Sequence, residues 1–366
     1  MTGDIFLKEK KIISLFSTDN IVSVEAVGHG NTNYTHIITL QKADGTTYKR
    51  VLQKINDFVY GDVDVLMNNI YNVTEFLRQQ LPAGHDPYRE VMTVVKSLNG
   101  NLYEKYGDSY YRCYIMIENS ISFQEVEKAE DFYYCGRTFA VFQKKLAAMP
   151  RGSVKELIKG FHNTKIRYEN FIRAISEDKL GRKAEVLDEI EFYLSRSHLA
   201  GEIVDKLESG IIPVRIIHND AKLNNMLFDA DTRTPLCIID FDTVMPGAAC
   251  YDFGDAIRFG GTRIPAEKTG SASLDIDLFR AFTEGYMSGA KGFLTREEID
   301  TLAVSSLVIT YECGMRFLTD YLEGDVTFRI KYPHHNRDRA INHRSMVLDI
   351  EEKLPQMKQI VLEYAR

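Results

Sequence analysis

Tryptophan is absent from the 366 residues of this chain, and cysteine is scarce. The few thiols are scattered and form no C-x-x-C pair; they are Cys113, Cys135, Cys237, Cys250 and Cys313. An odd number of isolated cysteines argues against a disulfide framework or a zinc site, and favours a reducing compartment.

Long apolar runs and basic blocks are also lacking. No stretch reaches the ~18 apolar residues that a membrane span requires. Charged residues from Lys8 to Lys11 interrupt the N-terminal segment before any signal-type apolar region. We therefore expect a cytoplasmic protein with no membrane partner. A formal charge of −7 without a Lys/Arg block argues against nucleic acid as a partner. The oligomeric state is not determined by these features.

Hydrophobic residues are abundant enough, at 44%, for a chain of this length to build two lobes. An amphipathic helix is predicted over residues 4–17, and alternating patterns predict strands over 21–27, 34–40 and 48–54. A further strand over 111–118 leads to a polar break, after which helical patterns dominate, among them 185–208 and a final helix over 346–364. The prediction is an α+β, bilobal, protein-kinase-like fold. Its small antiparallel N-lobe covers residues 1–118, and its mainly helical C-lobe covers residues 119–366.

Small residues follow the first predicted strand, in the segment Gly28-His29-Gly30-Asn31-Thr32-Asn33. Backbone N–H groups of such a turn can approach a triphosphate because glycine has no Cβ. Taken alone, the segment is more typical of an ordinary hairpin turn, and a lysine on the third strand makes the two interpretations about equal. The third strand carries Lys54, which would pair phosphates as a third-strand lysine does in protein kinases. Alternation places Gln53 and Lys54 on opposite faces, so a solvated Lys54 is the competing interpretation. Glu118 would end the strand at an adenine-binding hinge.

The stretch from His218 to Asp242 carries the strongest chemical signal. It contains H-x-D-x-K-x-x-N, which resembles the kinase catalytic-loop spacing H-R-D-x-x-x-x-N, and a predicted hairpin around residues 229–235. A carboxylate, a cation, an amide and further carboxylates would thereby converge. These are the groups that phosphoryl transfer requires.

Each polar residue of this stretch has an expected role. Asp220 would accept or orient the proton of an acceptor hydroxyl, and Lys222 would neutralise charge on the moving phosphoryl group. Asn225 and Asp240 would hold Mg²⁺, which prefers oxygen ligands, and Asp242 would bind a second metal. His218 would brace the loop rather than transfer protons. A silent binding module on the same scaffold, and a carboxylate hydrolase built on Asp240 and Asp242, are the alternatives.

Two later segments invite a functional interpretation. Asp252-Phe253-Gly254 has the letters of the kinase metal motif, but Asp252 is predicted to be a helix N-cap with Asp255 at position N3. Along a predicted helix from 296 to 323, Glu312, Arg316 and Asp320 share one side. They form either a structural ion-pair ladder or a polar stripe for a hydroxyl-rich substrate, with Arg316 as the substrate contact.

Together these motifs resemble the aminoglycoside phosphotransferase/choline kinase superfamily, and within it the bacterial N-acetylhexosamine 1-kinases. The resemblance spans nearly the whole chain. Its segments are 28–33, Asp178-Lys179-Leu180-Gly181-Arg182, 218–225, 239–247, 252–255, Glu312-Cys313-Gly314-Met315-Arg316-Phe317, 321–325 and Lys331-Tyr332-Pro333.

The resemblance implies a kinase that uses ATP and Mg²⁺ to phosphorylate the anomeric hydroxyl of N-acetylglucosamine or N-acetylgalactosamine. It places the base at Asp220, metal ligands at Asn225 and Asp240, and a sugar contact at Arg316. Where that family carries a histidine in the glycine loop, this sequence has Asn31, which leaves the sugar preference open. Choline, homoserine, methylthioribose and aminoglycosides are the alternative acceptors. A cationic acceptor calls for an acidic or aromatic cage, and the chain has no tryptophan for one.

Overall fold

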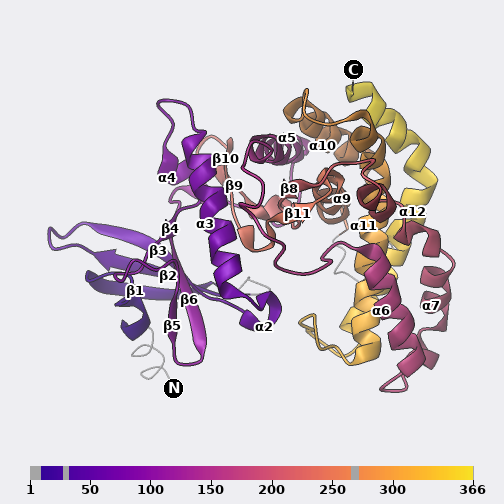
Figure 1. Cartoon of the computed structure of the whole chain (residues 1–366), viewed down its shortest axis with the longest axis horizontal. Coiled ribbons are helices and arrows are strands. Elements are labelled where there is room, and N and C mark those ends of the chain that lie inside the picture. The colour runs from indigo at the N-terminus through magenta and orange to yellow at the C-terminus, as the bar shows by residue number, and fades with distance from the viewer. Residues whose placement is uncertain (1–9, 28–32, 265–271, 366) are drawn as a thin grey trace. The chain divides into compact units, whose positions relative to one another are not determined.

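The structure is a computed structural model that describes residues 10–27, 33–264 and 272–365 (Figure 1). The chain forms two compact units. The first comprises Met1–Ile121, Met149–Ile158 and Leu227–Met245, and the second comprises Ser122–Ala148, Lys159–Met226 and Pro246–Arg366. The sequence placed a boundary after Glu118. The first unit runs on to Ile121 and adds two later segments, one of which contains Asp240 and Asp242.

The first unit is built on an antiparallel sheet, as the alternating patterns predicted. Its strands pair in the order β1-β2-β3-β6-β4, and β5 pairs with the N-terminal part of β6. Their bounds are β1 (Asn20–Val27), β2 (Tyr34–Gln41), β3 (Thr47–Lys54), β4 (Val94–Val95), β5 (Glu104–Tyr106) and β6 (Ser109–Ile115). Gly45 has a φ of 85° in the β2–β3 turn, a conformation that favours glycine.

The two faces of this sheet have different neighbours. One face bears Leu52, Tyr111 and Cys113, which pack in a hydrophobic cluster with Ile12 and Phe16 from the N-terminal segment. The opposite face bears Arg112, whose Nη1 lies 4.0 Å from the sulfur of Met67 on α3 (Val63–Gln79). Asp62 caps the N-terminus of α3, and its side chain accepts a hydrogen bond from Val65 N at 2.9 Å. The N-terminal segment therefore packs on one face of the sheet, and α3 packs on the other.

Shorter elements complete the first unit. They are α2 (Asp57–Tyr60), α4 (Pro87–Glu90) and a small sheet in the order β10-β9-β7, formed by β7 (Ser120–Ile121), β9 (Met226–Asp229) and β10 (Pro235–Ile238). The predicted hairpin around residues 229–235 is therefore confirmed. After β10 the chain makes a 3₁₀ turn, η4 (Phe241–Thr243), preceded by Asp240.

The second unit is mostly helical (Figure 1). Its helices are α5 (Ala129–Leu146), α6 (Thr164–Glu177), α7 (Leu187–Leu194), α8 (Val204–Glu208), α9 (Ala249–Gly260), α10 (Ile276–Gly289), α11 (Arg296–Glu323) and α12 (His335–Tyr364). The α11 helix packs against both α9 and α12, and α5 packs along α10. Among the described helices, none combines the length and apolar character that crossing a bilayer requires.

Glycine allows α5 and α10 to approach closely. A Cβ on Gly285 of α10 would lie 1.9 Å from Tyr133 O, and one on Gly136 of α5 would lie 2.3 Å from Phe282 O. Real Cβ atoms do not reach such distances, so larger side chains here would push the helices apart. The backbones of α5 and α10 can approach this closely because glycine has no side chain beyond a hydrogen atom.

Three helical predictions differ from the structure. The pattern over 185–208 is not continuous but is divided between α7, α8 and two 3₁₀ turns, η1 (Lys183–Glu185) and η2 (Ser197–Ala200). The last helix begins at His335 rather than Met346, because a polar and His-rich segment also becomes helical. Asp252 is not an N-cap, since α9 already begins at Ala249 and Ala248 takes the cap position. The predicted helix over 4–17 lies partly outside the described residues.

Candidate active site

The segment with the kinase-like spacing forms a loop after β8 (Arg215–Ile217) and ends in a 3₁₀ turn, η3 (Leu223–Asn225). Its backbone is held by the buried carboxylate of Asp252, which accepts hydrogen bonds from His218 N at 2.9 Å and Asn219 N at 2.7 Å. Gln143 Nε2 donates a third bond to Asp252 at 2.7 Å. Asp252 therefore fixes the loop from α9, a role that the N-cap interpretation missed.

Asp220 lies at the centre of this loop. Its carboxylate forms an ion pair with Lys222, and Asn225 Nδ2 donates to Asp220 Oδ2 at 3.0 Å and to its carbonyl at 2.9 Å. Burial would raise the pKa of Asp220, but the Lys222 ammonium outweighs it and lowers that pKa. The carboxylate is therefore ionised at neutral pH and able to accept a hydrogen bond from a hydroxyl group.

Lys222 is stabilised in its charged form by two carboxylates. Burial would lower its pKa, but the negative charges of Asp220 and Asp255 raise it. Asp255 in turn accepts from Arg258 Nη2 at 2.7 Å. The Lys222 ammonium also lies 5.8 Å from the ring centre of Phe259. The loop thus presents a cation that stays protonated beside the candidate base.

His218 is fully buried, and its ring lies edge-on to Phe139 with the ring centres 5.4 Å apart. Phe142 is a second aromatic neighbour at 6.0 Å. His218 therefore packs against two aromatic side chains of α5, and its bracing role stays a prediction.

Arg316 on α11 is the predicted substrate contact, and it remains partly exposed. Its guanidinium lies 5.7 Å from the ring centre of Phe161 and 5.5 Å from that of Phe328. Its Nη1 is 3.9 Å from Glu312 Oε1, which is an ion pair but too long for a hydrogen bond. Asp320, in contrast, is committed to structure, since it accepts from the backbone N–H groups of Thr327 and Phe328.

A buried histidine connects the Arg316 region with the catalytic loop. His162 Nδ1 lies 3.0 Å from Glu312 Oε1, and its Nε2 lies 3.2 Å from Asn219 O. Thr164 Oγ1 donates to the other Glu312 oxygen at 2.7 Å. Burial would lower the pKa of His162, but the Glu312 carboxylate raises it. Both ring nitrogens face acceptors, as suits a protonated imidazole. No local pattern could pair these two residues, because Glu312 is 150 positions from His162.

The remaining predicted residues belong to the first unit. Asp240 has a left-handed backbone with φ 65° and ψ 58°. Asp242 is buried and forms an ion pair with Arg112, a residue that the sequence interpretation had not singled out. Asn33 Nδ2 donates to Asp242 Oδ2 at 2.6 Å. Lys54 lies 6.0 Å from the ring centre of Tyr34. The predicted metal set is thus divided, with Asn225 in the second unit and the two aspartates in the first.

Other predicted nucleotide contacts are less informative. Glu118 is exposed beyond the end of β6. Gly28, Gly30 and Asn31 lie outside the described residues.

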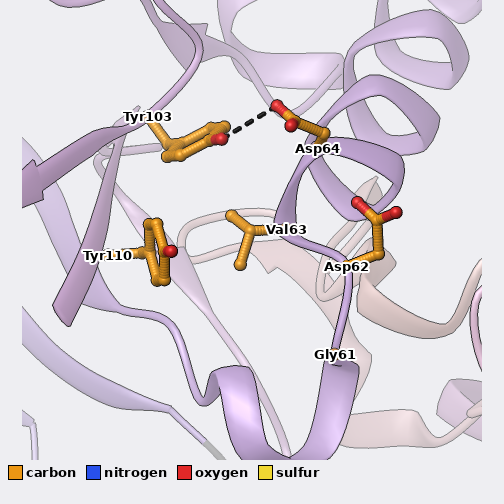
Figure 2. A pocket seen from close by; sticks show the side chains of 6 residues that line it. All are labelled: Gly61, Asp62, Val63, Asp64, Tyr103 and Tyr110. Carbon is orange, nitrogen blue, oxygen red and sulfur yellow. Dashed lines mark hydrogen bonds between the residues drawn. The ribbon is translucent and has the colours of Figure 1, made fainter. Parts of the chain in front are cut away.

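A pocket of about 350 Å³ opens in the first unit, and Figure 2 shows the side chains around it. Its lining residues are Gly61, Asp62, Val63, Asp64, Tyr103 and Tyr110. Tyr103 donates to Asp64 Oδ1 at 2.8 Å, and Asp62 caps α3. Among the predicted site residues that the structure describes, none lines this pocket.

Comparison with known proteins finds similarity to phosphotransferases. Residues 136–291 match the model of the Phosphotransferase enzyme family. An aminoglycoside phosphotransferase from Alicyclobacillus acidocaldarius superposes with a TM-score of 0.60 at 13% identity, covering 97% of this chain and 96% of that one. A choline kinase from Cryptosporidium parvum superposes with a TM-score of 0.55 at 14% identity, covering 99% and 98%.

An amicoumacin kinase in complex with AMP-PNP, Ca²⁺ and Ami superposes with a TM-score of 0.57 at 12% identity, covering 96% of each chain. At such identities the likeness establishes the fold, and the predicted α+β, protein-kinase-like class is confirmed. Across residues 136–291 the chain matches the phosphotransferase enzyme family, and over nearly its whole length it has the protein-kinase-like fold of aminoglycoside phosphotransferases and choline kinases.

Proposed function

We propose that this protein is an ATP- and Mg²⁺-dependent small-molecule kinase that phosphorylates the anomeric 1-hydroxyl of an N-acetylhexosamine. The observation that carries the phosphotransfer is the loop in which Asp220 is ionised, paired with Lys222 and bonded by Asn225. The match of residues 136–291 to the phosphotransferase family supports it. The sugar rests on the resemblance of the motifs to N-acetylhexosamine 1-kinases.

In the proposed reaction, Asp220 accepts a hydrogen bond from the acceptor hydroxyl and aims its oxygen at the γ-phosphorus. Its lowered pKa makes it better suited to orienting that hydroxyl than to holding the proton early in the reaction. Lys222 neutralises charge on the transferred group, because its raised pKa keeps the ammonium protonated. The hydroxyl proton passes to the Asp220 carboxylate as the new O–P bond forms and the bond to ADP breaks.

The chemistry of the available donor atoms suits a magnesium ion. Asn225 Nδ2 is used by Asp220, which leaves Asn225 Oδ1 as the atom able to act as a ligand. With the Asp240 carboxylate it would supply the hard oxygen donors that Mg²⁺ takes alongside substrate phosphates and water. When bound, the ion would offset negative charge between the phosphates.

Electrostatics around the loop favour a neutral, hydroxyl-rich acceptor over a cationic one. The carboxylates near the loop already face cations: Asp220 faces Lys222, Asp255 faces Arg258, and Glu312 faces His162. Arg316 adds a partly exposed guanidinium whose donors suit sugar hydroxyl or acetamido oxygens. An ammonium group of a choline-type acceptor would find no uncommitted carboxylate among these three.

The test is ADP release, measured by a coupled assay, with N-acetylglucosamine, N-acetylgalactosamine, choline, homoserine, methylthioribose and an aminoglycoside. We expect turnover with an N-acetylhexosamine, a 1-phosphate product in the ³¹P spectrum, and no turnover with the 1-O-methyl glycoside. Asp220→Asn should lower kcat by about 10²–10⁴-fold. The matched control is Asp277→Asn, at an exposed position of α10.

Asp220-dependent turnover confined to choline or an aminoglycoside would replace the sugar with that acceptor and keep the kinase. ATP binding without turnover of any acceptor would favour the non-catalytic nucleotide-binding module.

A further inference from the structure

Arg112 is a buried charge in the middle of an otherwise apolar strand of the first unit. The Arg112 side chain is only 1% exposed, and that of Asp242 is 3% exposed. Arg112 Nη1 donates to Asp242 Oδ1 at 2.5 Å, and Nη2 donates to Oδ2 at 2.8 Å. Two parallel bonds between a guanidinium and a carboxylate fix the carboxylate in direction as well as in distance.

The surrounding polar groups complete this contact. Arg112 Nε donates to Gln53 Oε1 at 3.0 Å, and Gln53 Nε2 donates to Thr35 Oγ1 at 3.0 Å. Asp242 Oδ2 also accepts from Asn33 Nδ2. The Asn33 side chain is held in turn, because its Oδ1 accepts a hydrogen bond from Asn56 N at 3.0 Å. Both carboxylate oxygens of Asp242 are therefore engaged by side chains of the first unit, which opposes its predicted use as a second metal ligand.

Sheet register shows which face carries this cluster. Gln53 pairs with Arg112, and Lys54 pairs with Tyr111. Tyr111 belongs to the hydrophobic cluster with Leu52 on the face opposite Arg112. Because neighbouring strand residues alternate between faces, Lys54 lies on the face away from Arg112 and Asp242. Within the first unit, the cation beside the Asp240–Asp242 segment comes from β6.

Asp240 stands two residues before the anchored carboxylate. Its left-handed backbone is uncommon for a residue other than glycine and persists where the surroundings hold it. Phe241 is buried at 2% exposure, and the 3₁₀ turn continues to Thr243. A shift of Asp242 would therefore be transmitted through one buried residue to the direction of the Asp240 carboxylate.

We propose that Arg112 is a positioning residue, which clamps Asp242 as an anchor and thereby aims Asp240 at the metal that accompanies the nucleotide. The proposal rests on the proposed function, in which Asp240 is a metal ligand. It assigns Asp242 to structure, and it makes Arg112 rather than Lys54 the cation that supports this segment.

The experiment compares Arg112→Lys, Asp242→Asn and Lys54→Met in the full chain, with Arg50→Lys as the matched control. Arg50 lies on neighbouring β3 and stacks on Tyr48 at 4.4 Å, so it reports on the general effect of losing a guanidinium from this sheet. Binding of Mn²⁺ in the presence of ADP, measured by electron paramagnetic resonance, gives affinity and stoichiometry without turnover. Urea denaturation measures stability in parallel.

We expect Arg112→Lys and Asp242→Asn each to weaken Mn²⁺ binding by about tenfold or more, with an unchanged number of ions. Lys54→Met and Arg50→Lys should change that affinity less than about twofold. Where turnover is available, the Mg²⁺ concentration at half-maximal rate should rise more than kcat falls. The double variant Arg112→Lys/Asp242→Asn should show much less than the product of the two single effects, since both remove the same contact.

Three results would overturn the proposal. The first is a loss of stability in Arg112→Lys with unchanged Mn²⁺ affinity, which would leave a structural role alone. The second is the loss of one bound ion in Asp242→Asn, which would restore Asp242 as a metal ligand. The third is a larger effect for Lys54→Met. If no acceptor is ever phosphorylated, the proposed function fails, while the Mn²⁺ binding measurements still decide whether Arg112 positions the site.

Discussion

Glu312 is a buried carboxylate on which the connection between α11 and the catalytic loop depends, and Glu312→Gln perturbs it without changing its shape. Its side chain is 1% exposed and faces His162 Nδ1 at 3.0 Å and Thr164 Oγ1 at 2.7 Å. Breaking a buried pair costs about 3–5 kcal/mol when a charge is left uncompensated. Glutamine can still accept from Thr164, and His162 can lose its proton. We therefore expect a loss of about 2–4 kcal/mol in the free energy of unfolding.

The pH dependence of this loss identifies its cause. Burial would lower the pKa of His162, but Glu312 raises it, so this stabilisation is fully present below pH ~6.5 and lost as pH rises through the folded-state pKa. Burial would raise the pKa of Glu312, but His162 and Arg316 lower it, so its contribution is present above pH ~4.5 and lost on acidification. The variant should therefore be more destabilised, relative to the native protein, at pH 5.5 than at pH 9.

Urea denaturation of both proteins at these two pH values is the assay. Glu297→Gln, at an exposed position of the same helix, is the matched control and should change stability by less than about 0.5 kcal/mol. The reasoning is refuted if Glu312→Gln costs less than about 1 kcal/mol, or if its cost is equal or larger at pH 9.

Three further changes test other parts of the structure. Asp252→Asn replaces one carboxylate oxygen, which accepts from the backbone N–H of His218 or Asn219, with an NH₂ group. The variant should lose about 1–3 kcal/mol in the free energy of unfolding, measured by urea titration, and should have a lower kcat. Unchanged kinetics would contradict the loop-anchoring role. Burial would raise the pKa of Cys313, but nearby cations lower it to about 6; iodoacetamide at pH 7.5 should therefore label it before the other cysteines in peptide mass spectrometry, and equal labelling would refute this. Gly285→Ala places a Cβ against Tyr133 O; it should destabilise by about 1–3 kcal/mol, although alanine is the better helix former, and a gain in stability would contradict the close approach.

Much of the fold follows from local patterns. Alternation of apolar residues gave the strands at 34–40 and 48–54, and regular helical spacing gave α11 with its bounds. The beginning of α12 was missed because its polar, His-rich first turns show no apolar periodicity. The split between α7 and α8 was missed because an amphipathic pattern can continue across a break in the backbone.

The candidate site was less accessible to local patterns, since its defining contacts join distant positions. Asp220 and Lys222 stand in one motif, and the structure joins them in an ion pair. Arg112, in contrast, is 130 positions from Asp242, and the available signal was a lone charge inside an apolar strand. The alternation of strand residues predicts that Gln53 and Lys54 lie on opposite faces of the sheet. Which residue lies on the face of Arg112 follows only from the pairing of Gln53 with Arg112. Their roles toward phosphates remain predictions.

The separation between Arg112 and Asp242 also bears on how the protein is made. Strand β6 leaves the ribosome 130 residues before its carboxylate partner. At a synthesis rate of about 5–20 residues per second, Arg112 is made roughly 6–26 seconds before Asp242. Burying an unpaired cation is unfavourable, so the face of the sheet around Arg112 should stay hydrated during that interval. The first unit is then expected to complete its folding only after residue 245 has been synthesised, although most of its sequence comes first.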